Sequence, residues 1–110
     1  MPTVYKVLGQ SSPSLGVLTD IYTVPNGNSA VISTINVCSR EPTNIGAFRI
    51  AIRPAGEAVS DKHYIAYDTA IPQLDSIALT IGVTLAQTDV ISVYAANANI
   101  SFSVFGSEIY

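Results

Sequence analysis

A short stretch of the chain holds its only histidine, His63, together with three of its five basic residues, Arg49, Arg53 and Lys62. Nucleophilic catalysis requires a nucleophile beside a general base that a third group orients. No serine stands in a G-x-S-x-G elbow, and the single cysteine, Cys38, lies in an alternating apolar run that predicts a small core side chain on a strand. We therefore expect no catalytic triad and a protein without enzymatic activity.

The sequence gives little support for a metal site or for a catalytic pair of carboxylates. Asp61 and His63 are two positions apart and could share one face of a strand, with Asp68 as a third ligand. Transition-metal sites usually draw on several histidines or cysteines, so a solvated strand end is the favoured interpretation. Glu57 and Asp61 could form a glycosidase pair, but nothing in a loop fixes the separation of their carboxylates. We expect no bound metal and, without a phosphate loop, dinucleotide fingerprint or Cys-x-x-Cys, no cofactor.

The composition argues against two classes of partner. Charged residues make up 12% of the 110 residues, where ~25% is usual, and the formal net charge is −3. A chain without a broad positive field has little means to attract nucleic acid or an anionic membrane. The sequence contains no signal-peptide core and no apolar run of the ~18 residues that a membrane helix needs, so we expect synthesis and folding in a cytoplasm.

Hydrophobic residues alternate with a period of two, which is typical of strands that bury one face. In the strand that holds both arginines, Phe48, Ile50 and Ile52 share one side, and the arginines share the other with two alanines. The pattern predicts strands at residues 4–8, 18–24, 30–38, 47–53, 63–67, 76–81, 90–95 and 100–105.

Turn-forming residues separate these runs. Asn26-Gly27 tolerates positive φ and predicts a hairpin tip, and the short interval at residues 96–99 predicts another hairpin. Residues 83–88 could form a loop or a short helical turn. About eight short strands favour one all-β domain over residues 1–110, an antiparallel β-sandwich that is jelly-roll-like. Strand-like sequence reaches nearly to both termini, which could pair with a neighbouring subunit or close the sheets of their own chain.

The arginines are candidates for contacts with other groups. Nucleic-acid binding would need aromatic residues interleaved with the basic ones, and none stands between Arg49 and Arg53. We expect their aliphatic stems to cover apolar neighbours and their guanidinium groups to reach Asp or Glu on an adjacent strand or another subunit. The candidate subunit-interface residues are Arg49, Arg53, Lys62, Tyr64 and Tyr110.

The tyrosines leave a second interpretation open, because tyrosine offers a flat apolar face and a hydroxyl to a sugar. Those that could line a carbohydrate-binding surface are Tyr22, Tyr64, Tyr67 and Tyr94. Without tryptophan, and with most tyrosines on alternating strands, packing in the core or at an interface is favoured. A low-charge surface suits contact with another protein better than contact with water, so a component of an assembly fits best.

Five stretches of the chain carry a resemblance to a known group of proteins. They are YKVLGQ at 5–10, IYTVPNGNSAVISTINVCSR at 21–40, FRIAIRPAGEA at 48–58, HYIAYD at 63–68 and FSVFGSEIY at 102–110. Over nearly its whole length the chain resembles small virion structural proteins of tailed bacteriophages. The resemblance implies a β-sandwich that assembles symmetrically on the particle, in the tail and baseplate region or as a cement protein that decorates the head.

That resemblance also sets the expected partners. It implies a homo-oligomer, with a trimer or hexamer matching phage architecture, and contacts with larger capsid or tail proteins of the virion. It brings no catalytic or metal-binding residues. The alternative is a carbohydrate-binding module for host recognition, which would need an exposed aromatic platform.

Overall fold

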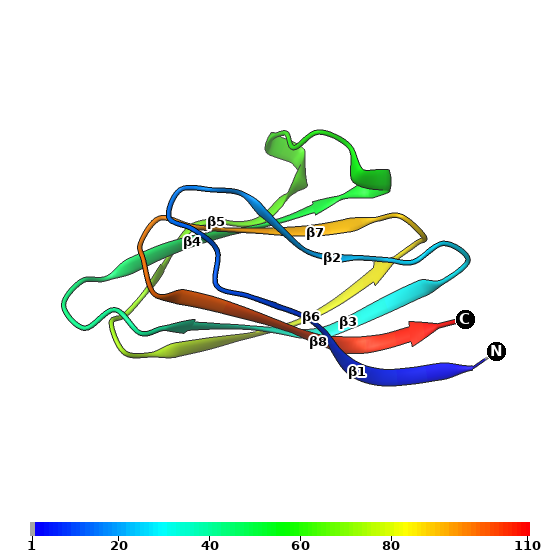
Figure 1. The fold of residues 1–110 in the computed structure, drawn as a ribbon, viewed down its shortest axis with the longest axis horizontal. Helices are drawn as coiled ribbons and strands as arrows, with labels where there is room; N and C mark the ends of the chain where they lie inside the picture. Colours follow the sequence, from blue (N-terminus) through cyan, green and yellow to red (C-terminus); the bar gives the residue numbers. More distant parts are fainter. Residues whose placement is uncertain (1) are drawn as a thin grey trace.

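The computed structural model describes residues 2–110 and consists almost entirely of strands and the turns between them (Figure 1). The strands are β1 (Thr3–Ser11), β2 (Thr19–Thr23), β3 (Ser29–Ser39), β4 (Gly46–Arg53), β5 (Tyr64–Ile71), β6 (Ser76–Leu85), β7 (Val90–Ala95) and β8 (Ile100–Ile109). Two short 3-10 turns, η1 (Pro54–Gly56) and η2 (Asp61–His63), lie between β4 and β5. Within the described residues, no helix has the length and hydropathy to cross a bilayer.

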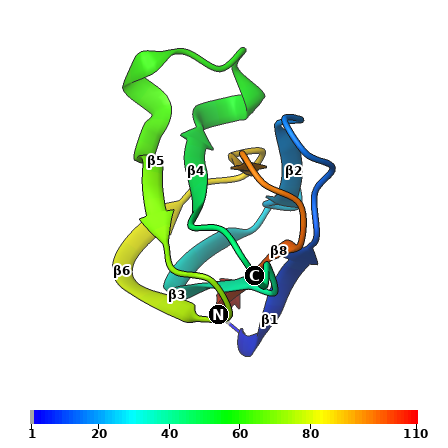
Figure 2. The ribbon, with the colours of Figure 1, turned by 90° about the vertical axis from the view of Figure 1, so that its left-hand side faces the viewer.

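The eight strands form two four-stranded antiparallel sheets that pack face to face (Figures 1 and 2). Sheet A has the order β1-β8-β3-β6, and sheet B has the order β2-β7-β4-β5. This is the strand order of a jelly roll, in which successive strands mostly alternate between the sheets. The expected all-β fold, a jelly-roll-like antiparallel sandwich, is confirmed.

The core fills the space between the inner faces of the two sheets. Alternation along each strand sends the apolar side chains inward, as in β8, where Ile100, Phe102 and Val104 are buried and the intervening serines are half-buried. The rings of Phe48 and Phe102 meet edge to face across the sandwich, with centroids 6.0 Å apart. Each fully buried large apolar side chain contributes ~1.5–3 kcal/mol, so this layer is the main source of stability.

Both predicted hairpins are wrong. The turn at Asn26-Gly27 does form, with φ at +82° for Gly27 and a 3.1 Å hydrogen bond from the Asn28 N–H to the Pro25 carbonyl. The strands it joins, however, belong to different sheets, and so do the strands on either side of residues 96–99. Local turn chemistry reverses the chain, but each strand then pairs with strands distant in sequence because both inner faces must be buried together.

Three smaller expectations also need correction. Residues 83–85 continue β6 as a strand instead of forming a loop or a helical turn. Cys38 lies in β3 as expected, but it is half-exposed, because it alternates with the inward-facing Val37. The C-terminal strand β8 is not a sheet edge, since it lies between β1 and β3, and the two terminal strands close sheet A together.

A buried carboxylate joins the terminal strands to sheet B. Glu108 is 3% exposed, and its oxygens accept hydrogen bonds from the Tyr22 hydroxyl at 2.6 Å and the Lys6 ammonium group at 2.8 Å. The Lys6 and Tyr22 hydrogen bonds hold the pKa of Glu108 below its usual value, against the opposing effect of burial. Burial and the hydrogen bond to Glu108 raise the pKa of Tyr22. One side chain thereby ties β8 to β1 and β2.

This cluster predicts a pH dependence of folding. A depressed native pKa contributes stability above the unfolded value of ~4.3, and that contribution is lost as the pH falls through the native pKa. Glu108→Gln removes the charge, so we expect the free energy of unfolding at pH 7 to fall by about 2 kcal/mol. Urea unfolding followed by circular dichroism at pH 7 and pH 3 should show a smaller pH effect in Glu108→Gln than in the parent.

The matched control is Asp61→Asn, which neutralises an exposed carboxylate without an ion pair among the described residues. It should leave the pH effect of the parent nearly intact. An equal pH effect in the parent and Glu108→Gln would contradict the role of the cluster.

Candidate interaction surfaces

The outer faces of the two sheets differ in charge. The strands of sheet B carry four charged residues, which are Asp20, Arg49, Arg53 and Asp68, and these form two ion pairs. The strands of sheet A carry only Lys6 and Glu108, which bond to each other on the inner side. The outer face of sheet A therefore presents no charged side chain from its strands.

On the outer face of sheet B, Arg49 forms an ion pair with an aspartate and stacks against two tyrosine rings. Its Nε is 2.6 Å from Oδ1 of Asp68 and its Nη2 is 3.3 Å from Oδ2, so the pair is bidentate. The guanidinium carbon lies 4.1 Å from the ring centroid of Tyr67 and 4.4 Å from that of Tyr94. The hydrogen bonds that Arg49 donates to the Asp68 carboxylate raise the pKa of Arg49 above its already high value. Both aromatic partners of Arg49 come from neighbouring strands, Tyr67 from β5 and Tyr94 from β7.

Arg53 binds the segment that connects β4 to β5. Its Nη2 lies 2.7 Å from Oδ1 of Asp20, and its Nε donates to the Ser92 hydroxyl at 3.0 Å. Its Nη1 donates to the carbonyls of Gly56 at 3.2 Å and Glu57 at 2.8 Å. Arg49 reaches an acid on the adjacent strand β5, as expected, whereas Arg53 reaches across β7 to Asp20 on β2, which is not adjacent to β4.

Residues 54–63, which we call the arm, project from sheet B (Figures 1 and 2). His63 is buried at the base of the arm, where its Nδ1 accepts the Ser60 N–H at 3.0 Å. Its Nε2 lies 3.2 Å from Oε1 of Glu57. Because Nδ1 is an acceptor, the proton of the neutral ring is on Nε2 and is donated to Glu57. The only imidazole of the chain thus has a structural role.

The structure does not bring Asp61, His63 and Asp68 together as a metal site. Asp68 is engaged by Arg49, and His63 faces Ser60 and Glu57. Across residues 2–110, no three His, Cys, Asp or Glu side chains are grouped so as to hold a metal ion.

A cavity of about 470 Å³ lies where the arm meets β5, lined by Asp61, Tyr64 and Tyr67. The two tyrosine rings are nearly perpendicular, at 84°, with centroids 4.9 Å apart. Tyr67 is 55% exposed, whereas Tyr22, another tyrosine considered for a carbohydrate surface, is buried between the sheets. A flat ring beside a carboxylate is a combination that can bind a hydroxylated ligand.

The five candidate interface residues do not form one surface. Arg49, Arg53 and Tyr64 lie on strands of sheet B, and Lys62 is exposed on the arm, 4.0 Å from Oε1 of Glu57. Tyr110 follows the last strand of sheet A, where its N–H donates to the Pro2 carbonyl at 3.0 Å. The two arginines are committed to intramolecular contacts.

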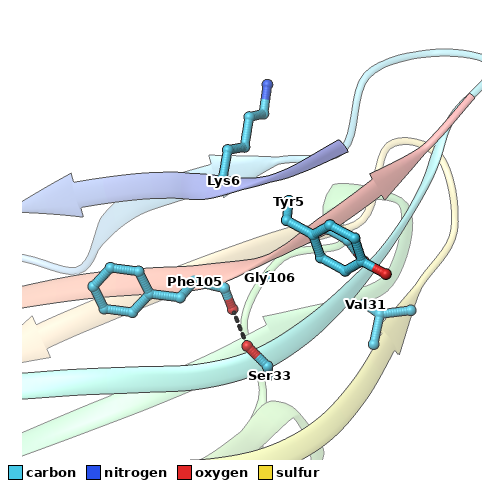
Figure 3. Close-up of a pocket in the computed structure, with 7 residues that line it drawn as sticks. Tyr5, Lys6, Val31, Ser33, Phe105 and Gly106 are labelled. Atoms are coloured by element: carbon cyan, nitrogen blue, oxygen red, sulfur yellow. Dashed lines mark hydrogen bonds between the residues drawn. The ribbon is translucent and has the colours of Figure 1, made fainter. Parts of the chain in front are cut away.

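The outer face of sheet A is better suited to contact with another protein than the five candidate interface residues are. A second cavity of about 470 Å³ lies on this face and is lined by Tyr5, Lys6, Val31, Ser33, Phe105, Gly106 and Ser107 (Figure 3). Tyr5 is 83% exposed, and Lys6 points to the other side of β1. The Ser33 hydroxyl donates to the Phe105 carbonyl at 3.1 Å, which occupies a polar group that would otherwise face the cavity.

The rest of this face is uncharged and consists mainly of small side chains. Cross-strand pairs on it include Asn36 with Ser103 and Thr34 with Thr80. This face was not predicted from the sequence, although the lack of any charged residue in 29–39 and 76–85 was a usable signal.

The Arg49 contacts predict a stabilising role within the chain. Arg49→Lys keeps the charge but loses the bidentate fork and the stacking between two rings. We expect it to lower the free energy of unfolding, measured by urea denaturation. Lys62→Ala, at an exposed position on the arm, should change it by less than ~0.5 kcal/mol. Equal effects of the two substitutions would contradict this role.

Comparison with known proteins assigns no family to the chain. Neither the protein-family models nor the curated proteins include a match to it. The two surfaces that could bind a partner are the uncharged outer face of sheet A and the tyrosine-lined cavity beside the arm.

Proposed function

We propose that the chain is a non-enzymatic structural subunit of a bacteriophage virion that docks on a larger capsid or tail protein through the outer face of sheet A. The observation that carries this proposal is the absence of any charged side chain among those that the strands of sheet A project outward. The sequence resemblance to small virion proteins supports the location on a phage particle.

The chemistry of this face suits a protein partner. Charged residues are depleted at the centres of protein interfaces, where aromatic anchors contribute much of the binding energy. Tyr5 and Phe105 supply two such anchors beside the cavity, and the neighbouring Ser33, Gly106 and Ser107 have little side-chain entropy to lose. A partner that covers this face would bury no unpaired charge.

Several ionisable side chains are engaged in structural bonds, which supports a non-enzymatic role. Arg49, Arg53 and Glu108 are held in ion pairs, and His63 bonds at both ring nitrogens. A general base must instead be free to reach a substrate proton.

The cavity beside the arm favours a second candidate, a carbohydrate-binding module for host recognition. Jelly rolls occur in viral capsid proteins and in lectins, so the fold is compatible with both functions. The cavity volume of about 470 Å³ lies within the range of small-ligand sites, and Asp61 could accept hydrogen bonds from sugar hydroxyls beside the rings of Tyr64 and Tyr67.

A charge placed on the outer face of sheet A tests the main proposal. Tyr5→Glu should reduce incorporation of purified protein into particles that lack the chain by at least about tenfold, because the carboxylate would lose its water on docking. Quantitative mass spectrometry of the purified particles gives the incorporated amount. The matched control is Ile45→Glu, an exposed apolar residue in the β3–β4 loop, away from this face. Undiminished incorporation of Tyr5→Glu would contradict the docking surface.

A glycan array separates the two candidates. The structural proposal predicts no saturable binding by the parent chain. Binding that is lost in Tyr67→Ala and retained in Tyr5→Ala would instead favour the carbohydrate module, because Tyr67 lines the cavity beside the arm and Tyr5 does not.

A further inference from the structure

The four edge strands of the sandwich are not equally protected against pairing with another chain. The edges of sheet A are β1 and β6, and those of sheet B are β2 and β5. Natural proteins protect such edges with charges, prolines or very short strands. Lys6 in β1, Asp20 in β2 and Asp68 in β5 supply a charge to three of the edges. In contrast, β6 has ten residues, SIALTIGVTL, without a charge or a proline.

The inner row of β6 is incompletely covered. Its side chains alternate strictly between half-buried and exposed until Leu85, which is buried. The half-buried row packs against the core and consists of Ile77, Leu79, Ile81 and Val83. The exposed row consists of Ala78, Thr80, Gly82 and Thr84 with Ser76, none of which is large. A further strand beside β6 would cover the apolar row without meeting a bulky or charged group on the outer face.

We propose that β6 pairs with the β6 of a second copy, antiparallel about a twofold axis, so that two A sheets become one continuous sheet. This inference rests on the proposed assembly function and names the contact between copies. Opposed residues in an antiparallel pair lie on the same face, so apolar positions must oppose apolar positions. Centring the pair on Thr80 or on Ile81 satisfies this rule, and the second register places Leu79 opposite Val83.

A second copy suits this edge better than another edge of the same protein does. The alternation of β6 matches itself when read in the opposite direction, and no like charges meet, since the strand carries none. If β6 paired with β1, β2 or β5 of a second copy, it would lie beside a strand that contains a charged residue. The joined sheets also extend the uncharged outer face that we propose docks on the larger virion protein.

Two matched lysine substitutions test the pairing. Thr80 and Thr34 oppose each other on the outer face of sheet A, but Thr80 is on the edge strand and Thr34 is one strand inside. Light scattering after size-exclusion chromatography should give a dimer for the parent chain and for Thr34→Lys. Thr80→Lys should weaken the dimer at least tenfold, because two lysines then meet near the twofold axis. Its circular dichroism and thermal unfolding should resemble those of Thr34→Lys.

Cross-linking gives an independent readout of the register. In a Cys38→Ser background, Thr80→Cys should form a disulfide-linked dimer under mild oxidation in the register centred on Thr80, and Ile81→Cys should do so in the register centred on Ile81, whereas Thr34→Cys should form none in either. Equal loss of the dimer in both lysine variants would indicate face-to-face stacking and overturn the edge pairing. A dimer that Thr80→Lys leaves intact would overturn it too.

A parent chain that stays monomeric at high concentration would also overturn the pairing of copies. That result would leave the docking of sheet A on a larger protein to the particle-incorporation experiment. Failure of the pairing and failure of the proposed function are therefore distinguishable.

Discussion

The pairing of every charged strand residue with a partner in the same chain is the constraint on which the surfaces of this protein depend. Lys6 bonds to Glu108, Arg49 to Asp68 and Arg53 to Asp20. In the first pair Glu108 is buried between the sheets and Lys6 is partly exposed at the edge of sheet A, and the other two pairs lie on the outer face of sheet B. The outer face of sheet A and the edge strand β6 are left without charge, and these are the surfaces through which we propose that the protein assembles.

The three ion pairs stabilise different parts of the molecule. The Glu108 carboxylate is buried, so the cost of its desolvation must be offset by the hydrogen bonds from Lys6 and Tyr22. These bonds connect the terminal strands to sheet B. The exposed ion pairs of Asp20 and Asp68 contribute little to stability through charge, and their main effect is to fix the positions of Arg53 and Arg49. Arg49 fixes two tyrosine rings, and Arg53 bonds to the base of the arm, so the face of sheet B is organised by its own contacts.

Local alternation was enough to predict the eight strands, the inward row of β4 and the jelly-roll-like class, because side-chain burial follows a period of two. It failed for the turns at residues 24–28 and 96–99, since a turn does not determine which distant strand its neighbours pair with. The acid partners of Arg49 and Arg53 were predicted only by type, because their identity depends on that pairing. The uncharged outer face was missed for a similar reason: it exists only when four separate strands are placed side by side.

If the chain is a virion subunit, as we propose, a reconstruction of the particle at a resolution that shows side chains will reveal which of its faces is covered. We expect the outer face of sheet A to be covered by another protein, with Tyr5 and Phe105 buried in the contact and β6 lying beside a strand of a second copy. A particle in which that face points into solvent while the arm and the Tyr64–Tyr67 cavity make the contact would contradict it.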